Sequence, residues 1–299
     1  MIRYFKRTLI IIGVLFIIYS LAKSWLYTRK GAQAISFQAA KKECFQGGDK
    51  WRYCVYTTED HQDDVYLYFL HGKSFDENVW NDGTQYPAQI QKYWRDNRMR
   101  PPKVITISYG GLWFITPKMT KKDTGLLDKF KTEVFKTIEG KLGEPKYRML
   151  AGDSMGGINA LTLSFYMGEM FQKTASLCPP LYSLSPFSSW PEIWEFLKKS
   201  GARPKSMMTV FTVARVLFTN DEEWEKFSSV ALVKKANPEN FPELYLSSGL
   251  YDMFGNYEGV LEFADIAKKR GFNIHWRPAW GDHCAIDIPS LADFLQPSR

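Results

Sequence analysis

Several features that assign chains to special classes are missing from these 299 residues. There is no internal repeat, so a solenoid or repeat array is excluded, and there is no low-complexity tract. Hydrophobic residues make up 45% and aromatic residues 16%, so the composition does not indicate disorder. A chain of this length can form one large α/β domain with a substantial core, or two small domains.

Cysteine and histidine are scarce, with four of each. No C-x-x-C pair and no Cys/His spacing typical of zinc is present, and we predict neither a metal nor a cofactor. Four cysteines fit an oxidising compartment without requiring one. A Gly-Gly pair between Cys44 and Cys54 allows a tight turn and a local disulfide. Cys178 and Cys284 fall at the same predicted sheet edge. They are either within bonding reach or unrelated buried thiols, and we favour thiols because disulfide geometry is demanding.

The net charge of +7 is not gathered into a long basic run. The positive residues come as separated pairs such as Lys198-Lys199 and Lys268-Lys269. Pairs of this kind are typical of solvated helix faces, and no nucleic-acid motif accompanies them. We therefore expect no nucleic-acid partner.

A long, uniformly apolar run occurs at the N-terminus, from Leu9 to about Ala22, after a positively charged lead. Residues 1–34 are therefore predicted to be a membrane anchor or a secretory signal. The one A-x-A-like site, at residues 32–34, lies far beyond the apolar run, which favours an uncleaved anchor. Residues 35–299 are then expected outside the cytoplasm, held at the membrane or, after cleavage, secreted or periplasmic.

Strand-like and helix-like segments alternate through residues 35–299. Continuous apolar runs such as residues 65–70 are typical of buried parallel strands, and residues 124–143 carry apolar side chains at helical spacing. This alternation predicts a mostly parallel sheet flanked by helices. From about Pro180 to Asn240 the alternation breaks, and we interpret this segment as a helical lid insert.

One motif in the middle of the chain points to chemistry. Residues 152–156, Gly-Asp-Ser-Met-Gly, fit the pattern G-x-S-x-G, which alone arises often by chance. Here a predicted strand ends just before Ser154 and a predicted helix begins just after it. That strand–turn–helix context is typical of a nucleophile elbow, so we predict that Ser154 is a catalytic nucleophile. The alternative is a tight structural turn.

A serine hydroxyl needs a base, and in α/β-hydrolases the chain order is serine, acid, histidine. His275 and His283 follow Ser154, and His283 is favoured because it lies in a loop after the last strand, whereas His275 lies inside that strand. Asp252 follows the preceding strand at the carboxyl edge, where sites in such sheets lie. It is favoured over Asp282, which directly precedes the histidine.

Two backbone N–H groups are predicted to bind the oxyanion: that of Met155, at the start of the helix, and that of Lys73, in the loop after an earlier strand. Gly72 allows close backbone approach there, and we expect His71 mainly to order the turn. The candidate substrate-binding residues are His71, Gly72, Trp80, Trp190 and Trp194.

With these residues assembled, the chain resembles the putative-esterase family of α/β-hydrolases, which includes esterase D, feruloyl esterases and mycolyltransferases. The likeness runs from about Tyr53 to Leu295, and its most specific piece is "GDSMGGINAL", joined by "LHG", "SLCPP", "SSGLYD" and "WGDHCAID". The resemblance implies an α/β-hydrolase fold. It also implies a Ser154, Asp252, His283 triad and oxyanion donors at Met155 and Lys73.

The favoured prediction is a serine hydrolase that cleaves carboxylic esters through an acyl-enzyme. An acyltransferase that passes the acyl group to a sugar or lipid alcohol is an alternative, suggested by the aromatic residues of the insert. A non-catalytic binding module with this fold is a third. The sequence indicates neither the acyl nor the alcohol part of the substrate, nor the oligomeric state.

Overall fold

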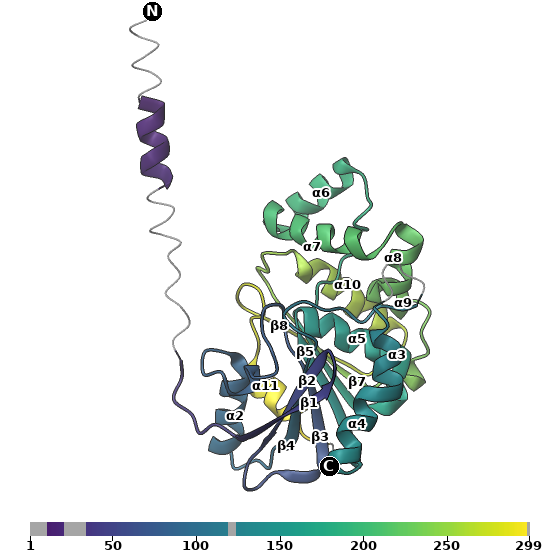
Figure 1. The fold of residues 1–299 in the computed structure, drawn as a ribbon. Helices are drawn as coiled ribbons and strands as arrows, with labels where there is room; N and C mark the ends of the chain where they lie inside the picture. Colours follow the sequence, from purple (N-terminus) through teal and green to yellow (C-terminus); the bar gives the residue numbers. More distant parts are fainter. Residues whose placement is uncertain (1–10, 21–33, 119–123, 298–299) are drawn as a thin grey trace, which may run out of the picture.

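The protein is built around a single eight-stranded sheet, seen in a computed structural model that describes residues 11–20, 34–118 and 124–297 (Figure 1). The strand order is β1-β2-β4-β3-β5-β6-β7-β8. The strands are β1 (Lys41–Gly48), β2 (Trp51–Thr57), β3 (Gln62–Leu70), β4 (Pro102–Ser108), β5 (Tyr147–Asp153), β6 (Lys173–Leu177), β7 (Glu243–Gly249) and β8 (Ile274–Ala279). From β4 to β8 all neighbours are parallel, whereas β1 and β2 pair antiparallel at one edge.

The central strand β3 contains the continuous apolar run from which the sequence predicts a buried strand. Residues 65–70 of β3 are all buried because helices cover both faces of the sheet. The prediction of a mostly parallel sheet flanked by helices is therefore confirmed. The sequence reading missed β1, whose side chains are largely exposed and which has neither an apolar run nor a clean alternation.

The hairpin of β1 and β2 carries the first disulfide. Cys44 and Cys54 are direct partners in the register of the two strands and are bonded to each other. The local disulfide considered in the sequence analysis is thus present.

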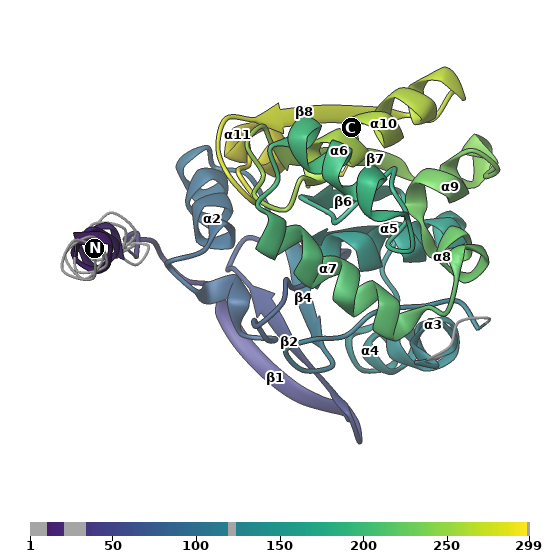
Figure 2. The ribbon, with the colours of Figure 1, turned by 90° about the horizontal axis from the view of Figure 1, so that it is seen from above.

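Helices cover both faces of the sheet (Figures 1 and 2). On one face, α2 (Tyr86–Asp96) and α11 (Ile288–Phe294) bury Ile90, Trp94 and Leu291 against the strands. The other face is covered by α3 (Leu126–Lys129), a π turn (Phe130–Val134), α4 (Phe135–Leu142), α5 (Met155–Met167) and α10 (Asn256–Lys269). Short 3₁₀ turns lie at Val79–Asn81, Gly168–Met170 and Pro238–Asn240.

The predicted lid insert is helical. Between β6 and β7 the chain forms α6 (Trp190–Ser200), α7 (Pro204–Leu217), α8 (Asp221–Phe227) and α9 (Ser229–Val233). Both views show α6 and α7 beyond the carboxyl ends of the strands, with α7 crossing over the sheet edge. Local sequence signals set these bounds: Ser189 and Glu192 form a capping box at the start of α6, and Gly201 ends it with a positive φ.

The predicted N-terminal anchor or signal falls mostly outside the described residues. Of residues 1–34, the structure describes 11–20, which are helical with exposed apolar side chains, and residue 34. No helix within the described ranges is both long and apolar enough to span a membrane.

Candidate active site

Ser154 lies at the sharp turn between the end of β5 and the start of α5. Its backbone has φ 52° and ψ −113°, a conformation that side chains rarely adopt, and this turns the hydroxyl outward above the sheet edge. The turn requires close packing of backbones. A Cβ on Gly156 would lie 1.8 Å from the carbonyl oxygen of Leu70, so only glycine fits there. The predicted elbow geometry is therefore present.

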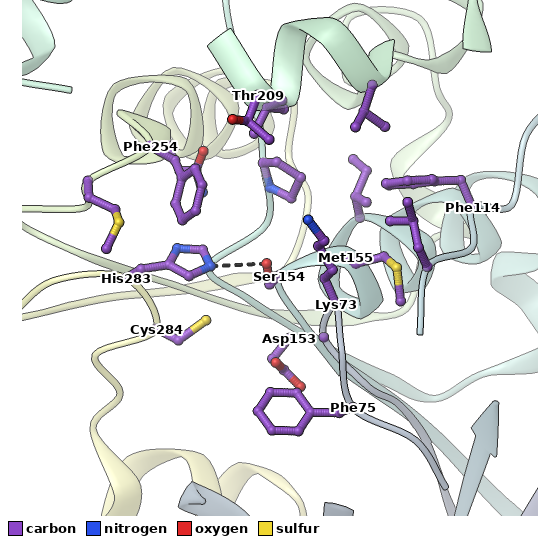
Figure 3. A pocket seen from close by; sticks show the side chains of 18 of the residues that line it. Lys73, Phe75, Phe114, Asp153, Ser154, Met155, Thr209, Phe254, His283 and Cys284 are labelled. Atoms are coloured by element: carbon purple, nitrogen blue, oxygen red, sulfur yellow. Dashed lines mark hydrogen bonds between the residues drawn. The ribbon is translucent and has the colours of Figure 1, made fainter. Parts of the chain in front are cut away.

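Three side chains from three loops meet at this edge. His283, in the loop after β8, has its Nε2 3.0 Å from the Ser154 Oγ and its Nδ1 2.8 Å from the Asp252 Oδ2 (Figure 3). With the proton on Nδ1, that N–H donates to the carboxylate and Nε2 accepts from the serine hydroxyl. This is the geometry that a histidine needs to take a proton from a serine nucleophile.

Asp252 is held by its own loop and by α10. Its side chain is fully buried, one oxygen accepts from the Phe254 N–H at 2.8 Å, and the other receives the histidine. The Asn256 Nδ2 donates to it from 3.5 Å. A buried carboxylate with these partners has one orientation, and that orientation fixes the imidazole ring.

The two rejected candidates have other partners. Asp282 accepts the backbone N–H groups of Met253 and His283, both at 2.8 Å, so it orders the two loops. His275 lies on β8 with its Nε2 2.7 Å from the Glu243 Oε1. The structure therefore brings His283 and Asp252 to Ser154, and leaves His275 in a strand.

Our interpretation of Cys178 and Cys284 as two unrelated thiols was wrong, because they form a disulfide. Cys178 follows β6 and Cys284 directly follows His283, so the bond ties the histidine loop to the middle of the sheet edge. The sequence placed both residues at this edge but carried no information on how their Cβ atoms point. Two disulfides in one chain are typical of extracellular or periplasmic proteins.

The two cysteines of this disulfide also belong to a group of side chains that could be mistaken for a metal site. Within the described ranges, Cys178, His283 and Cys284 form the one group of ligand atoms close enough to share an ion. Because both sulfurs are in a disulfide, they are not thiolates, and these residues do not fit a metal.

Met155 and Lys73, whose backbone N–H groups are the predicted oxyanion donors, both line the cavity that contains Ser154. Met155 begins α5, where the first N–H groups have no acceptor within the helix, and Lys73 lies in the loop after β3. Among the hydrogen bonds of the described residues, none has the N–H of Lys73 or Met155 as its donor.

The cavity around these groups has a volume of about 810 Å³, within the range of small-molecule sites. Its walls come from the loops at the sheet edge, from the start of α2, and from the insert helices α7 and α8. Ser154 and His283 are among its lining residues, as is Gly72.

The sequence model of the putative esterase family matches residues 48–279. The chain belongs to the putative esterase family. Membership of this family supports ester hydrolysis, and the resemblance noted in the sequence is confirmed. No curated protein matches the chain.

Solved structures of esterases share the fold of this family member. A ferulic acid esterase aligns with a TM-score of 0.58 and 17% identity, over 86% of this chain and 96% of its own. A fluorophosphonate-binding serine hydrolase of Staphylococcus aureus, FphF, aligns with a TM-score of 0.56 and 16% identity, over 86% and 98%. An arylesterase aligns with a TM-score of 0.59 and 13% identity, over 89% of this chain and 84% of its own. The α/β-hydrolase fold is therefore established.

Four of the predicted substrate-binding residues of this esterase-family chain do not line the cavity. His71 is fully buried, with its Nε2 2.9 Å from the Ser108 Oγ, and burial lowers its pKa. Trp80 is buried against Phe69 in the core. The insert residues Trp190 and Trp194 are exposed on α6.

The sequence reading overlooked Asp153, the residue before the serine. Asp153 lines the cavity and is 6% exposed as a residue. Its carboxyl accepts from the Tyr86 hydroxyl at 3.3 Å and from the N–H of Gly72. Burial raises the pKa of Asp153 to about 6. A Cβ on Gly72 would lie 2.5 Å from this carboxyl, which explains the glycine. The sequence did contain a signal for this residue, because Asp153 occupies the first variable position of the G-x-S-x-G motif.

Proposed function

We propose that this protein is a serine hydrolase that cleaves carboxylic esters through an acyl-enzyme formed on Ser154. The observation that carries the proposal is the unbroken hydrogen-bond chain from Asp252 through His283 to the Ser154 hydroxyl, at the wall of a ligand-sized cavity. Nucleophilic catalysis by a serine needs a base within hydrogen-bond distance and a third group that orients this base.

In the first half-reaction the Ser154 Oγ attacks the ester carbonyl while His283 Nε2 takes its proton. The negative charge that develops on the carbonyl oxygen is bound by the N–H groups of Met155 and Lys73. A donor of this kind lowers the barrier by about 3–4 kcal/mol. The protonated histidine, stabilised by Asp252, then gives its proton to the leaving alcohol.

In the second half-reaction water takes the place of the alcohol. His283 deprotonates the water, which attacks the acyl carbon, and the same two N–H groups bind the second oxyanion. Collapse releases the carboxylic acid and returns the proton to Ser154. The cycle needs no redox step.

Hydrolysis is proposed in preference to transfer of the acyl group to an alcohol. Of the aromatic residues of the insert that suggested transfer, Phe211 is buried between α6 and α7, and Trp190 and Trp194 are exposed on α6. Phe218 and Trp224 do line the cavity, but an apolar lining can hold the acyl group in either reaction and does not favour transfer. Product analysis with an added alcohol checks this proposal. Transfer replaces it if the ester of that alcohol, rather than the free acid, is the main product.

Export of the domain is part of the proposal and is supported by the two disulfides. Retention at the membrane by residues 1–34, rather than cleavage as a signal, rests on the sequence alone. Mass spectrometry of the protein isolated from its host distinguishes the two, since cleavage removes about 3–4 kDa, at about 110 Da for each residue.

The test of the proposed function is hydrolysis of p-nitrophenyl butyrate by the full-length chain. Wild type should release p-nitrophenol, and Ser154→Ala should lose at least about 10⁴-fold in kcat/KM. Ser183→Ala is the control, because Ser183 is exposed in the insert and does not line the cavity. Equal loss in both variants, or activity that survives in Ser154→Ala, would contradict the proposal.

A further inference from the structure

Helix α7 has two apolar faces: one packs against α6, and the other lines the active-site cavity. Met207 and Phe211 pack with Ile193 and Leu197 of α6 in a small core of the insert. A second set of apolar residues at helical spacing lines the cavity: Val210, Val213, Ala214 and Leu217, of which Val210 also packs against the insert core. The second face thus forms the roof of the active-site cavity.

The floor and sides opposite this face are apolar as well. Leu112 and Phe114 come from the loop after β4, Ile158 comes from α5, and Trp224 and Phe227 come from α8. Ile158, Trp224 and Phe227 belong to the same packed cluster as Ala214, and Phe114 packs against that cluster. These residues therefore surround one part of the cavity, which we call the apolar side.

The ionisable groups of the cavity are not part of this apolar cluster, although Figure 3 shows Lys73 beside Ser154 on the side of Met155. Among the described residues that line it, the ionisable ones are Lys73, Tyr86, Asp153, Asp282 and His283, and none of these belongs to the apolar side. A charged or strongly polar group would lose hydration there without gaining a partner. An alkyl or aryl group gains by leaving water.

The reaction itself decides which half of an ester faces the apolar side. The leaving oxygen takes its proton from His283, so the alcohol half must lie on the side of that ring. The acyl half then points away from the histidine. Figure 3 shows His283 on one side of Ser154 and Phe114 and Met155 on the other. The apolar side is therefore where the acyl half lies.

We propose that the apolar side is an acyl pocket, and that the preferred substrates are esters of an apolar carboxylic acid larger than acetic acid. The proposal rests on the proposed function, since it assigns the two halves of an ester that Ser154 cleaves. Each methylene buried in such a pocket raises kcat/KM by about fourfold. From acetyl to hexanoyl, four methylenes longer, the gain is roughly 200- to 250-fold.

The test keeps the alcohol constant and varies the acyl group. The full-length protein is assayed for kcat/KM with p-nitrophenyl acetate, butyrate, hexanoate and octanoate, and with p-nitrophenyl benzoate. A rise from acetate to hexanoate supports the acyl pocket. The benzoate arm decides whether the pocket prefers an aryl or an alkyl group. Equal kcat/KM for acetate and hexanoate would overturn the inference.

Val213→Trp and Val216→Trp form a matched pair on α7. Val213 is half-buried at the cavity, whereas Val216 is 49% exposed and does not line it. Filling the pocket at Val213 should lower the hexanoate-to-acetate ratio of kcat/KM at least about tenfold, and the Val216 variant should keep the wild-type ratio. An equal shift in both variants would contradict the pocket.

Val213→Ala covers the case in which the tryptophan variant does not fold. It enlarges the pocket, so the acyl length of highest kcat/KM should move upward by at least one methylene, and an unchanged optimum would count against the pocket. Failure of the proposed function looks different. In that case no p-nitrophenyl ester is cleaved, or cleavage survives in Ser154→Ala, whatever the acyl length.

Discussion

The sheet edge and the insert meet at one cavity but are specified in different ways. At the edge, Ser154, Asp252 and His283 each follow the end of a strand, and short sequence signals mark those positions. The insert contributes apolar side chains from α7 and α8, whose positions depend on packing between helices distant from the serine. Local backbone geometry therefore positions the residues of the proposed chemistry, whereas packing between distant segments determines which substrate groups fit the cavity.

The largest effect expected from this comparison is loss of the proposed base. His283→Ala should lower kcat/KM for p-nitrophenyl butyrate by roughly 10⁴- to 10⁶-fold, because the serine hydroxyl then has no proton acceptor. His275→Ala is the matched control and should stay within about twofold, since His275 of β8 pairs with Glu243 of β7. Steady-state kinetics of both variants measures the difference. Comparable losses would show that the edge is not organised around His283.

The next effect separates the two aspartates of the edge. Asp252→Asn should reduce kcat by about 10⁴-fold, because the amide favours the wrong imidazole tautomer. Asp282→Asn keeps an oxygen for the N–H groups of Met253 and His283 and should lose less than about tenfold. The reverse ranking in kcat would assign the acid to Asp282 and refute the Asp252 assignment.

Removing each disulfide in turn compares the active-site edge of the sheet with the hairpin of β1 and β2. The Cys178–Cys284 bond spans 106 residues and the Cys44–Cys54 bond spans 10. In the chain-entropy account, removing the first lowers the free energy of unfolding by about 5 kcal/mol and removing the second by about 3 kcal/mol.

Urea unfolding of the two double alanine variants measures these losses. Only the variant at Cys178 and Cys284 should also lose activity while still folded, because Cys284 adjoins His283. Equal activity in both folded variants would mean that the disulfide does not position the histidine.

The smallest expected effect concerns Asp153. Because burial raises its folded pKa to about 6, from 3.8, folding favours its protonated form. The stability this contributes is complete below the unfolded pKa and is lost as the pH rises through about 6. Between pH 4 and pH 7 the stability of wild type should therefore fall by roughly 2–3 kcal/mol relative to Asp153→Asn.

Urea unfolding of wild type and Asp153→Asn at several pH values provides that comparison. The asparagine keeps an oxygen for the N–H of Gly72 but does not titrate, so groups shared by both proteins cancel in the difference. Parallel pH profiles would show that Asp153 titrates normally.

The sequence predicts more of the edge than of the insert, for physical reasons. A buried strand such as β3 appears as an apolar run, and Gly156 marks a backbone contact that only glycine permits. These signals are local. The exposed strand β1 left no such signal, because its side chains face solvent.

Contacts between segments that are distant in the sequence were not predicted. The disulfide of Cys178 with Cys284 depends on the relative direction of two loops, and Trp190 and Trp194 carry no mark that distinguishes an exposed helix face from a cavity wall. The same holds for Asp153, whose burial results from the approach of Gly72 and Tyr86. When a side chain is surrounded by segments distant in the sequence, its environment is seen in the structure and not in the local sequence.

The central claim is that Ser154 is the nucleophile and that His283 activates it. The most direct measurement is to treat the full-length protein with a fluorophosphonate and to locate the adduct by peptide mass spectrometry. We expect one phosphonylated peptide, modified at Ser154, absent in Ser154→Ala and formed much more slowly in His283→Ala. An adduct on another residue, or equal labelling of wild type and Ser154→Ala, would contradict it.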